Sequence, residues 1–365
     1  MITWIEINKK NLYHNLKQFK NLASNSEIWP VIKSNAYGHG FENIVNLLNK
    51  NKFVSGFMVV NLDEGIFLKK LTNKPIMVLS YFEKENSYLK DLDNISLPIY
   101  DLETAKYLNN LGKNRNKKYI INIKIDTGTS RLGFRVEEAE KVIKELQKKE
   151  YLEINSIYTH YAESESENQD FTIKQYKLFK KIVDKFSIKN HSVCSAACIS
   201  QLQAQSNIVR LGISLYGLWP SEATKKRGED SNIEIKPVMS WKTKIIQIKE
   251  LKKGDSIGYD RTYICDKDIK IAILPIGYNE GYDRSLSNKG SVIIRDKKYS
   301  IRGNICMNLI MVEIDNKNIK IGDEVILIGS SKNNNISVED LANNAGTINY
   351  EIITRVNSKI KRVII

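Results

Sequence analysis

The chain has 365 residues, of which 42% are hydrophobic and 27% are charged. This is the composition of a globular protein, and the length exceeds one ordinary core of about 100–150 residues, so two domains are expected and a disordered chain is excluded. The formal net charge is +14, but the basic residues are scattered along the chain in short pairs such as Lys69-Lys70 and Lys252-Lys253. A solvated basic surface is therefore expected, and nucleic acid is not an expected partner.

The opening segment MITWIEINKK has no apolar core of the kind that signal peptides carry, and the sequence has no run of about 18 apolar residues that could span a bilayer. We therefore expect a cytoplasmic protein with no membrane partner. The four cysteines and four histidines form neither a CxxC pair nor an HExxH helix. Free thiols are expected, and no metal site is predicted.

In chain order, the first expected elements are a strand over residues 3–7 and an amphipathic helix with an apolar stripe at Leu12, Leu16, Phe19 and Ala23. Eight β-rich runs then alternate with polar, helix-like stretches, and buried parallel strands read as such continuous apolar runs. This alternation predicts a (β/α)8 barrel. An open doubly wound sheet has a similar pattern, but no GxGxxG follows the first strand. The eight runs are residues 29–33, 53–60, 75–79, 97–100, 119–126, 154–161, 191–195 and 208–215.

Residues 221–232 are polar and have no apolar period, so an exposed connection is expected there. Beyond it, strands separated by turns, with little helix, are expected at residues 238–248, 269–276, 291–294, 309–314 and 324–328. The predicted fold class is α/β, with an N-terminal (β/α)8 barrel over residues 1–236 and a mainly β C-terminal domain over residues 237–365. The first strand, about residues 1–8, is equally able to pack on the C-terminal domain.

Barrel enzymes place their sites at the carboxyl ends of the strands. Lys33 ends the first barrel strand inside an apolar run, where a bare ammonium is costly to bury. Such a lysine is either paired or lowered in pKa, and a lowered pKa suits Schiff-base chemistry. A lysine that reaches out of the barrel mouth is the alternative interpretation.

Two further strand ends carry polar side chains. Lys124 and Asp126 share one side of the fifth strand, where a structural ion pair is the simplest interpretation. His160 ends the sixth strand, as either a catalytic group or a satisfied polar residue.

The last two barrel strands carry weak signs of a phosphate site. Ser195 ends the seventh strand, and Arg210 with Gly212 and Ile213 ends the eighth, where barrels often bind phosphate with backbone N–H groups. A phosphate site, a buried lysine and an arginine that stays charged together suit pyridoxal 5'-phosphate.

The residues at these strand ends match a known family. Residues 31–40, Val-Ile-Lys-Ser-Asn-Ala-Tyr-Gly-His-Gly, resemble the cofactor-lysine signature of alanine racemases, and further motifs follow in family order over essentially the full chain. These motifs are residues 126–128 and 131–133, Thr159-His160, residues 195–197, Arg210 with Gly212, Gly258-Tyr259, residues 276–278, Cys306-Met307 and residues 348–351.

The resemblance implies a pyridoxal 5'-phosphate enzyme that racemises L-alanine and D-alanine and supplies D-alanine for cell-wall peptidoglycan. It implies a head-to-tail homodimer in which each C-terminal domain completes the active site of the partner. Lys33 would hold the cofactor and act as the base on one face of the substrate. Tyr259 of the partner subunit would act on the opposite face, as racemisation requires.

The resemblance also assigns binding roles. His160 and Arg210 would lie at the cofactor ring, Arg131 would bind the substrate carboxylate, and Lys124 matches a lysine that is carbamylated in some members. Tyr278 and Met307 would line the access path and a small side-chain pocket. The residues that would hold the phosphate are Tyr37, Ser195, Gly212, Ile213 and Tyr350.

The sequence departs from the family pattern at Thr129, Cys194, Leu211, Asp260 and Asn308. Thr129 and Asn308 make a slightly more polar pocket, so a serine or broader-specificity racemase on the same scaffold is the alternative function. A diamino-acid decarboxylase fits the sequence less well, because the chain is short for that group. A non-enzymatic vitamin B6-binding protein also fits less well, because it would not need Tyr259 and Met307.

Overall fold

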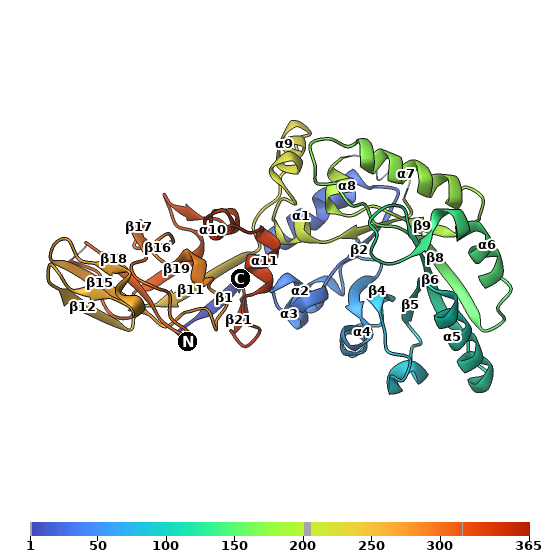
Figure 1. The fold of residues 1–365 in the computed structure, drawn as a ribbon, viewed down its shortest axis with the longest axis horizontal. Helices are drawn as coiled ribbons and strands as arrows, with labels where there is room; N and C mark the ends of the chain where they lie inside the picture. The colour runs from blue at the N-terminus through green and yellow to red at the C-terminus, as the bar shows by residue number, and fades with distance from the viewer. Residues whose placement is uncertain (1, 201–205, 316) are drawn as a thin grey trace. The chain divides into compact units, whose positions relative to one another are not determined.

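A computed structural model describes residues 2–200, 206–315 and 317–365, which form two compact units (Figure 1). The barrel unit comprises Tyr13–Ser34 and Ile44–Ile235. The β unit comprises Met1–Leu12, Asn35–Asn43 and Lys236–Ile365. The chain therefore passes from one unit to the other more than once, because its first residues and a short segment after Ser34 belong to the β unit.

The barrel unit is built on eight parallel strands. Hydrogen-bonded pairing runs from β3 to β9 in one sheet and joins β10 to β2 in another. Bridges between Ile28 and Val54 and between Cys194 and Arg210 connect the two sheets into a closed ring. The predicted (β/α)8 barrel is therefore confirmed. The strands are β2 (Glu27–Pro30), β3 (Phe57–Asn61), β4 (Ile76–Tyr81), β5 (Ile95–Ile99), β6 (Tyr119–Asp126), β8 (Leu152–Tyr158), β9 (Lys189–His191) and β10 (Ile208–Leu211), with β7 (Phe134–Arg135) beside β6.

Helices cover the outside of these strands (Figure 1). Their ends follow capping rules: Asn61 accepts the N–H of Glu64 at the start of α4, and Asp101 accepts that of Thr104 at the start of α5. In the described part of the chain, none of the helices has the length and apolar character that a bilayer crossing needs. The helices are α1 (Lys9–Leu22), α2 (Lys33–Tyr37), α3 (Phe41–Leu48), α4 (Leu62–Lys69), η1 (Ser87–Lys90), α5 (Leu102–Arg115), α6 (Val136–Leu146), α7 (Asp170–Val183), α8 (Ser195–Ile199), η3 (Ile213–Tyr216) and α9 (Glu222–Asp230).

The β unit holds two main sheets. The larger has the order β17-β16-β19-β11-β1-β21 and includes the first strand of the chain, which pairs with β11 and β21. The smaller has the order β12-β15-β18 and packs a cluster that includes Ile271 and Met311. The strands are β1 (Trp4–Ile7), β11 (Met239–Lys244), β12 (Gln247–Leu251), β13 (Ser256–Ile257), β14 (Tyr263–Ile264), β15 (Ile269–Leu274), β16 (Ser291–Ile294), β17 (Lys297–Ser300), β18 (Ile310–Ile314), β19 (Glu324–Ser330), β20 (Asn335–Ile336) and β21 (Arg362–Ile364).

Residues 221–232, expected to be an exposed connection, contain helix α9, and among them only Thr224 and Gly228 are buried. Ser221 and Thr224 form a capping box at its start, and the ring of Trp219 lies against Gly228. A polar helix fixed by its cap and by one aromatic contact has no apolar period for sequence reasoning to detect. Short helical elements of the β unit were also missed: η4 (Tyr259–Arg261), η5 (Arg284–Leu286), α10 (Val338–Ala345) and α11 (Asn349–Thr354).

Two helical glycines give opposite predictions for substitution by alanine. At Gly65 in α4 an added Cβ would lie 3.6 Å from Val78 and 3.7 Å from Ile95, which is ordinary contact. At Gly112 in α5 it would lie 2.6 Å from the Lys117 carbonyl oxygen and from Cβ of Tyr151. Gly65→Ala is expected to leave stability unchanged or raise it by about 0.5–1 kcal/mol, whereas Gly112→Ala should lower it by about 1–3 kcal/mol. Urea unfolding of both variants checks this, and equal midpoints would contradict the packing described.

Candidate active site

Arg210, on β10, is buried and is held by five hydrogen bonds. Its Nη1 donates to Nδ1 of His191 (2.8 Å) and to the His191 carbonyl oxygen (3.1 Å). Its Nη2 donates to Nδ1 of His160 (3.1 Å) and to the carbonyl oxygens of Thr159 and Ser192 (both 2.9 Å). Among the described residues Nε has no hydrogen-bond acceptor, so this N–H is available to a ligand.

The two histidines beside Arg210 are neutral and have a defined tautomer. A guanidinium only donates, so Nδ1 of His160 and of His191 must accept, and each ring proton sits on Nε2. Burial, and then the charge of Arg210, lower the pKa of both rings well below the usual range. Nε2 of His191 faces Oγ of Ser156 (3.1 Å), which donates to Oδ1 of Asn122 (2.7 Å). This buried chain orients His191 and thereby one side of the guanidinium.

Lys124, on β6, is only 6% exposed and lies among cations. Burial, followed by repulsion from Arg131 and Arg210, lowers the pKa of its ammonium to about 8. Nζ stands 5.3 Å from the centre of the Tyr158 ring, a distance at which the face of the ring attracts a cation. In the residues that the structure describes, no carboxylate forms an ion pair with Lys124, so the charge of this lysine is not neutralised by the chain.

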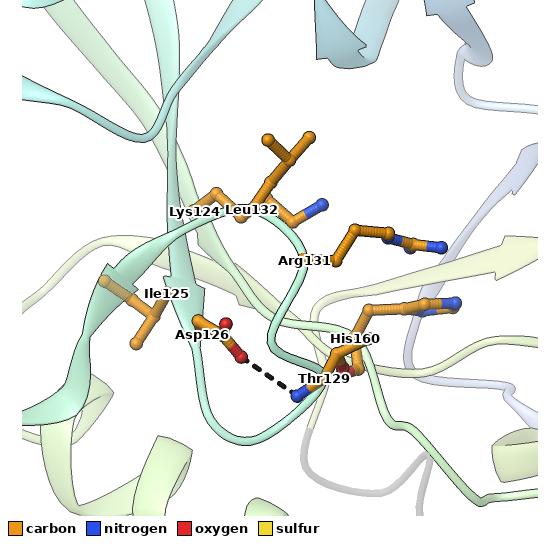
Figure 2. Close-up of a pocket in the computed structure, with 7 residues that line it drawn as sticks. All are labelled: Lys124, Ile125, Asp126, Thr129, Arg131, Leu132 and His160. Atoms are coloured by element: carbon orange, nitrogen blue, oxygen red, sulfur yellow. Dashed lines mark hydrogen bonds between the residues drawn. The ribbon is translucent and has the colours of Figure 1, made fainter.

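Asp126 does not pair with Lys124, contrary to the structural ion pair considered from the sequence. Its Oδ1 accepts the backbone N–H groups of Gly128 (2.9 Å), Thr129 (2.9 Å) and Ser130 (3.1 Å). The carboxylate therefore shapes the turn after β6, as aspartates commonly do, and is directed away from the lysine (Figure 2).

This turn forms one side of a small pocket. Figure 2 shows the side chains of Lys124, Arg131 and His160 one below the other, with their nitrogen atoms on the same side. The Thr129 hydroxyl donates to the carbonyl oxygen of His160 (2.5 Å), which ties the turn to the end of β8. The pocket is lined by Lys124, Ile125, Asp126, Thr129, Arg131, Leu132 and His160.

Lys33 lies in the same electrostatic environment. Burial, then the charge of Arg131, lower the pKa of the Lys33 ammonium, while Glu64 raises it by less. The Glu64 carboxylate accepts the backbone N–H groups of Ser34 (2.7 Å) and Val60 (2.9 Å), so it fixes the backbone that follows the lysine. After Lys33, residues 34–37 all have φ between 52° and 55°, a left-handed turn that costs energy in residues other than glycine.

A cradle of backbone groups follows β9 and β10. Ser195 opens α8, and its Oγ accepts the N–H of Gly212 (3.1 Å) at the start of η3. The first N–H groups of a helix have no partner within the helix, so those of Ile213 and Ser214 point out of the start of η3 as potential phosphate donors. The structure thus brings Ser195, Gly212 and Ile213 together, as the phosphate assignment requires.

The remaining predicted site residues belong to the β unit. Tyr37 and Tyr350 lie near each other, with ring centroids 6.3 Å apart. Tyr259, Tyr278 and Met307 are exposed, and Tyr259 is 69% accessible. Large apolar side chains on a surface often mark an interface.

The sequence matches two family descriptions. Residues 7–220 match the alanine racemase N-terminal domain, and residues 238–364 match the alanine racemase C-terminal domain. The chain belongs to the alanine racemase family. It is therefore an amino-acid racemase, which agrees with the buried lysine and cationic pocket of the barrel unit.

Several racemases are similar to this chain over their full length. An alanine racemase of Halothermothrix orenii is 36% identical, and the match covers 99% of this chain and 96% of that protein. The solved alanine racemase of Clostridium difficile 630 has a TM-score of 0.91 and 36% identity, covering 100% and 96% of the two chains. A histidine racemase from Leuconostoc mesenteroides has a TM-score of 0.90 and 26% identity, covering 100% and 98%.

Sequence reasoning missed His191 as a functional residue. The sequence places it at the start of the seventh run, whereas it is the last residue of β9 in the structure, and its contact with Arg210 depends on β9 and β10 being neighbours. Ser156 and Asn122 gave no signal, because a short polar residue inside a strand has many structural roles. In the described ranges, no group of three or more His, Cys, Asp or Glu side chains could hold a metal ion.

Proposed function

We propose that this racemase interconverts L-alanine and D-alanine with pyridoxal 5'-phosphate, in the cytoplasm, and so supplies D-alanine for peptidoglycan. The observation that carries the proposal is the set of cations at the barrel mouth, Lys33, Lys124, Arg131 and Arg210, whose mutual repulsion is not balanced by an ion pair with a carboxylate among the described residues. Such a site favours a ligand with a phosphate and a carboxylate.

The residues present fit this cofactor. When bound, pyridoxal 5'-phosphate draws electron density from the α-carbon of an attached amino acid and makes its proton more acidic. Ser195, Gly212 and Ile213 would hold the phosphate, through the Ser195 hydroxyl and the N–H of Ile213 beside Gly212, with Tyr37 and Tyr350 of the β unit. The free Nε–H of Arg210 would donate to the ring nitrogen, and His160 would support that arginine.

Lys33 and Tyr259 would be the two catalytic bases, one for each face of the substrate α-carbon. The lowered pKa of Lys33 increases the share of neutral amine, which is the form that can accept a proton. Tyr259 would come from the partner subunit in a homodimer with shared active sites. The exposure of Tyr259, Tyr278 and Met307 supports this, because these side chains would be covered in such an assembly.

The division of the chain into two functional domains follows from these proposed residue roles. Residues 1–236 would bind the cofactor, while residues 237–365 would contribute Tyr259, Tyr278 and Met307 to the partner's site. This division concerns function, since β1 pairs with strands of the β unit.

Alanine is the preferred substrate in this proposal. Arg131 would bind the carboxylate, and Met307 and Tyr278 would leave room for a small side chain. The alternative, a serine or broader-specificity racemase, has support from the histidine racemase of similar fold. Against it, the hydroxyl proton of Thr129 already goes to the His160 carbonyl oxygen, and the Asn308 amide donates to Glu280 (2.7 Å).

Lys124 would carry a carbamate. The neutral amine attacks carbon dioxide, an N–C bond forms as one C–O π pair moves to oxygen, and the nitrogen loses a proton to water. The product is an anion beside Arg131, in place of a fourth cation. Burial of a lysine among cations, with no carboxylate partner among the described residues, supports this modification.

The first of three predictions about this site tests the cofactor lysine and the second base. Borohydride makes a lysine–pyridoxal linkage irreversible, so peptide mapping of the reduced holoenzyme is expected to find the label on Lys33. Tyr259→Phe should retain that label but lose at least about 100-fold in racemisation, because it removes one proton-transfer group. Label on another lysine, or full activity of Tyr259→Phe, would overturn the assignment.

Comparing turnover of alanine, serine and histidine in the same assay decides the specificity.

The second prediction tests the shared site. Lys33→Ala and Tyr259→Phe proteins are expected to be inactive alone, but subunit exchange creates hybrids in which one site carries both lesions and the other carries neither. An equal mixture should recover about a quarter of the wild-type activity, because about half the dimers are hybrids with one intact site. No recovery despite mass-spectrometric proof of hybrids would place both bases in one chain.

The third prediction concerns Lys124 and pH. With a pKa of about 8, about half of the Lys124 amines are neutral at pH 8, against less than about 1% for an ordinary lysine. A carbon-13 carbamate signal from labelled bicarbonate is therefore expected at pH 8, and it should fade as the pH falls and protonation competes. The signal should be absent in Lys124→Ala and present in Lys148→Ala. An equal signal in Lys124→Ala would exclude the modification.

A further inference from the structure

The loop that carries Tyr259 has an unusual backbone. Gly258 has a φ of 72°, and the two residues after Tyr259, Asp260 and Arg261, have φ values of 62° and 51°. Left-handed conformations are unfavourable for residues with a Cβ, and they persist only where surrounding contacts impose them. The conformation of this loop therefore requires an external support.

Asn304 provides that support. Its Nδ2 donates to the carbonyl oxygen of Tyr259 (3.2 Å) and to Oδ2 of Asp260 (3.0 Å). One side-chain amide thus holds both the backbone of the tyrosine and the side chain of the first left-handed residue. Nη2 of Arg284 lies 3.9 Å from the same Asp260 oxygen and adds a longer-range attraction.

The loop also rests directly on the segment that contains Asn304. A Cβ at Gly258 would lie 2.9 Å from Cε of Met311 and 3.3 Å from the backbone nitrogen of Asn304. A Cβ at Gly303 would lie 2.5 Å from the carbonyl oxygen of Ile257. Asn288 fastens the same segment by accepting the N–H of Gly303 (2.6 Å). The support is therefore itself fixed and can act as a rigid base.

We propose that Asn304 and Asp260 are positioning residues that set the direction in which the Tyr259 side chain projects. The proposal rests on the proposed role of Tyr259 as a catalytic base. Because the Tyr259 side chain is 69% exposed, packing within its own unit orients it little, and the backbone at residues 258–261 determines its direction. A base must be held close to the geometry of proton transfer, and an error of about 1 Å can cost about 100-fold in rate.

The chain offers a matched control in the turn between β16 and β17. There Arg295 and Asp296 also have left-handed φ values, 48° and 63°, and Nδ2 of Asn334 donates to the Asp296 carbonyl oxygen (2.7 Å). Asn334→Ala removes an equivalent side-chain support of an equivalent turn. It touches no proposed catalytic or binding residue.

The experiment uses holoenzyme and α-deuterated alanine of each enantiomer. L-Alanine and D-alanine have equal free energies in water, so kcat/KM must stay equal in the two directions of racemisation. In each direction a different base removes the α-proton, so the isotope effects of the two directions can differ. In Asn304→Ala we expect kcat to fall about tenfold. The deuterium isotope effect should rise for the enantiomer whose proton goes to Tyr259 and should not rise for the other. Asp260→Ala should show the same fall in kcat and the same one-sided rise in the isotope effect. Asp260→Asn keeps an acceptor oxygen, so its kcat and isotope effects should lie closer to those of the wild type.

A second measurement does not depend on the cofactor or on turnover. In apoprotein labelled with fluorotyrosine, the Tyr259 resonance is identified by its loss in Tyr259→Phe. It is expected to narrow and shift toward free fluorotyrosine in Asn304→Ala and to stay unchanged in Asn334→Ala. The proposal would be overturned if Asn304→Ala had an unchanged Tyr259 resonance and wild-type isotope effects. It would also be overturned if the deuterium isotope effect rose equally for both enantiomers. Retained racemisation by Tyr259→Phe would instead refute the role of Tyr259 itself.

Discussion

The guanidinium of Arg210 is the interaction around which the barrel site is organised. It is buried on β10, and its two terminal nitrogens are used completely by His160, His191 and carbonyl oxygens from the ends of two neighbouring strands. Because an arginine does not release its proton, both histidines must present an unprotonated nitrogen to it. A single cation thereby fixes two ring tautomers, joins β8, β9 and β10, and leaves one N–H free for a ligand.

Arg210 is one of four cations that together determine the electrostatics of the barrel mouth. Lys33, Lys124, Arg131 and Arg210 repel one another, and the nearest carboxylates, Asp126 and Glu64, are engaged by backbone N–H groups. Burial first, and this repulsion second, lower the pKa values of both lysines. The same cations that repel one another attract a doubly anionic ligand. One distribution of charge thus contributes both to the affinity for an anionic ligand and to the lowered pKa values of the two lysines.

The two units contribute in different physical ways. In the barrel unit Lys124, Ser195 and Arg210 are buried, and Arg210 is held by hydrogen bonds from residues at the ends of neighbouring strands. In the β unit Tyr259, Tyr278 and Met307 are exposed, and their placement relies on backbone conformation and on supports such as Asn304. This contrast agrees with the proposed division, in which the barrel unit binds the cofactor and the β unit contributes residues to the site of a partner subunit. Strain in the Tyr259 loop is then a means of orientation, because a left-handed backbone allows few alternatives.

The sequence by itself determined the barrel, because eight apolar runs separated by helical stretches leave few other parallel architectures. It also determined the family, because the residues around Lys33 form a specific local motif, and it placed Lys33, His160, Ser195 and Arg210 at or just beyond the ends of barrel strands. Only the tertiary structure decided which neighbours these residues have. Asp126 turns to backbone amides instead of Lys124, His191 meets Arg210 across two strands, and Asn304 reaches a loop 45 residues away in the chain. Contacts of this kind depend on register and on side-chain direction between distant segments, which local patterns of hydrophobicity and charge do not encode.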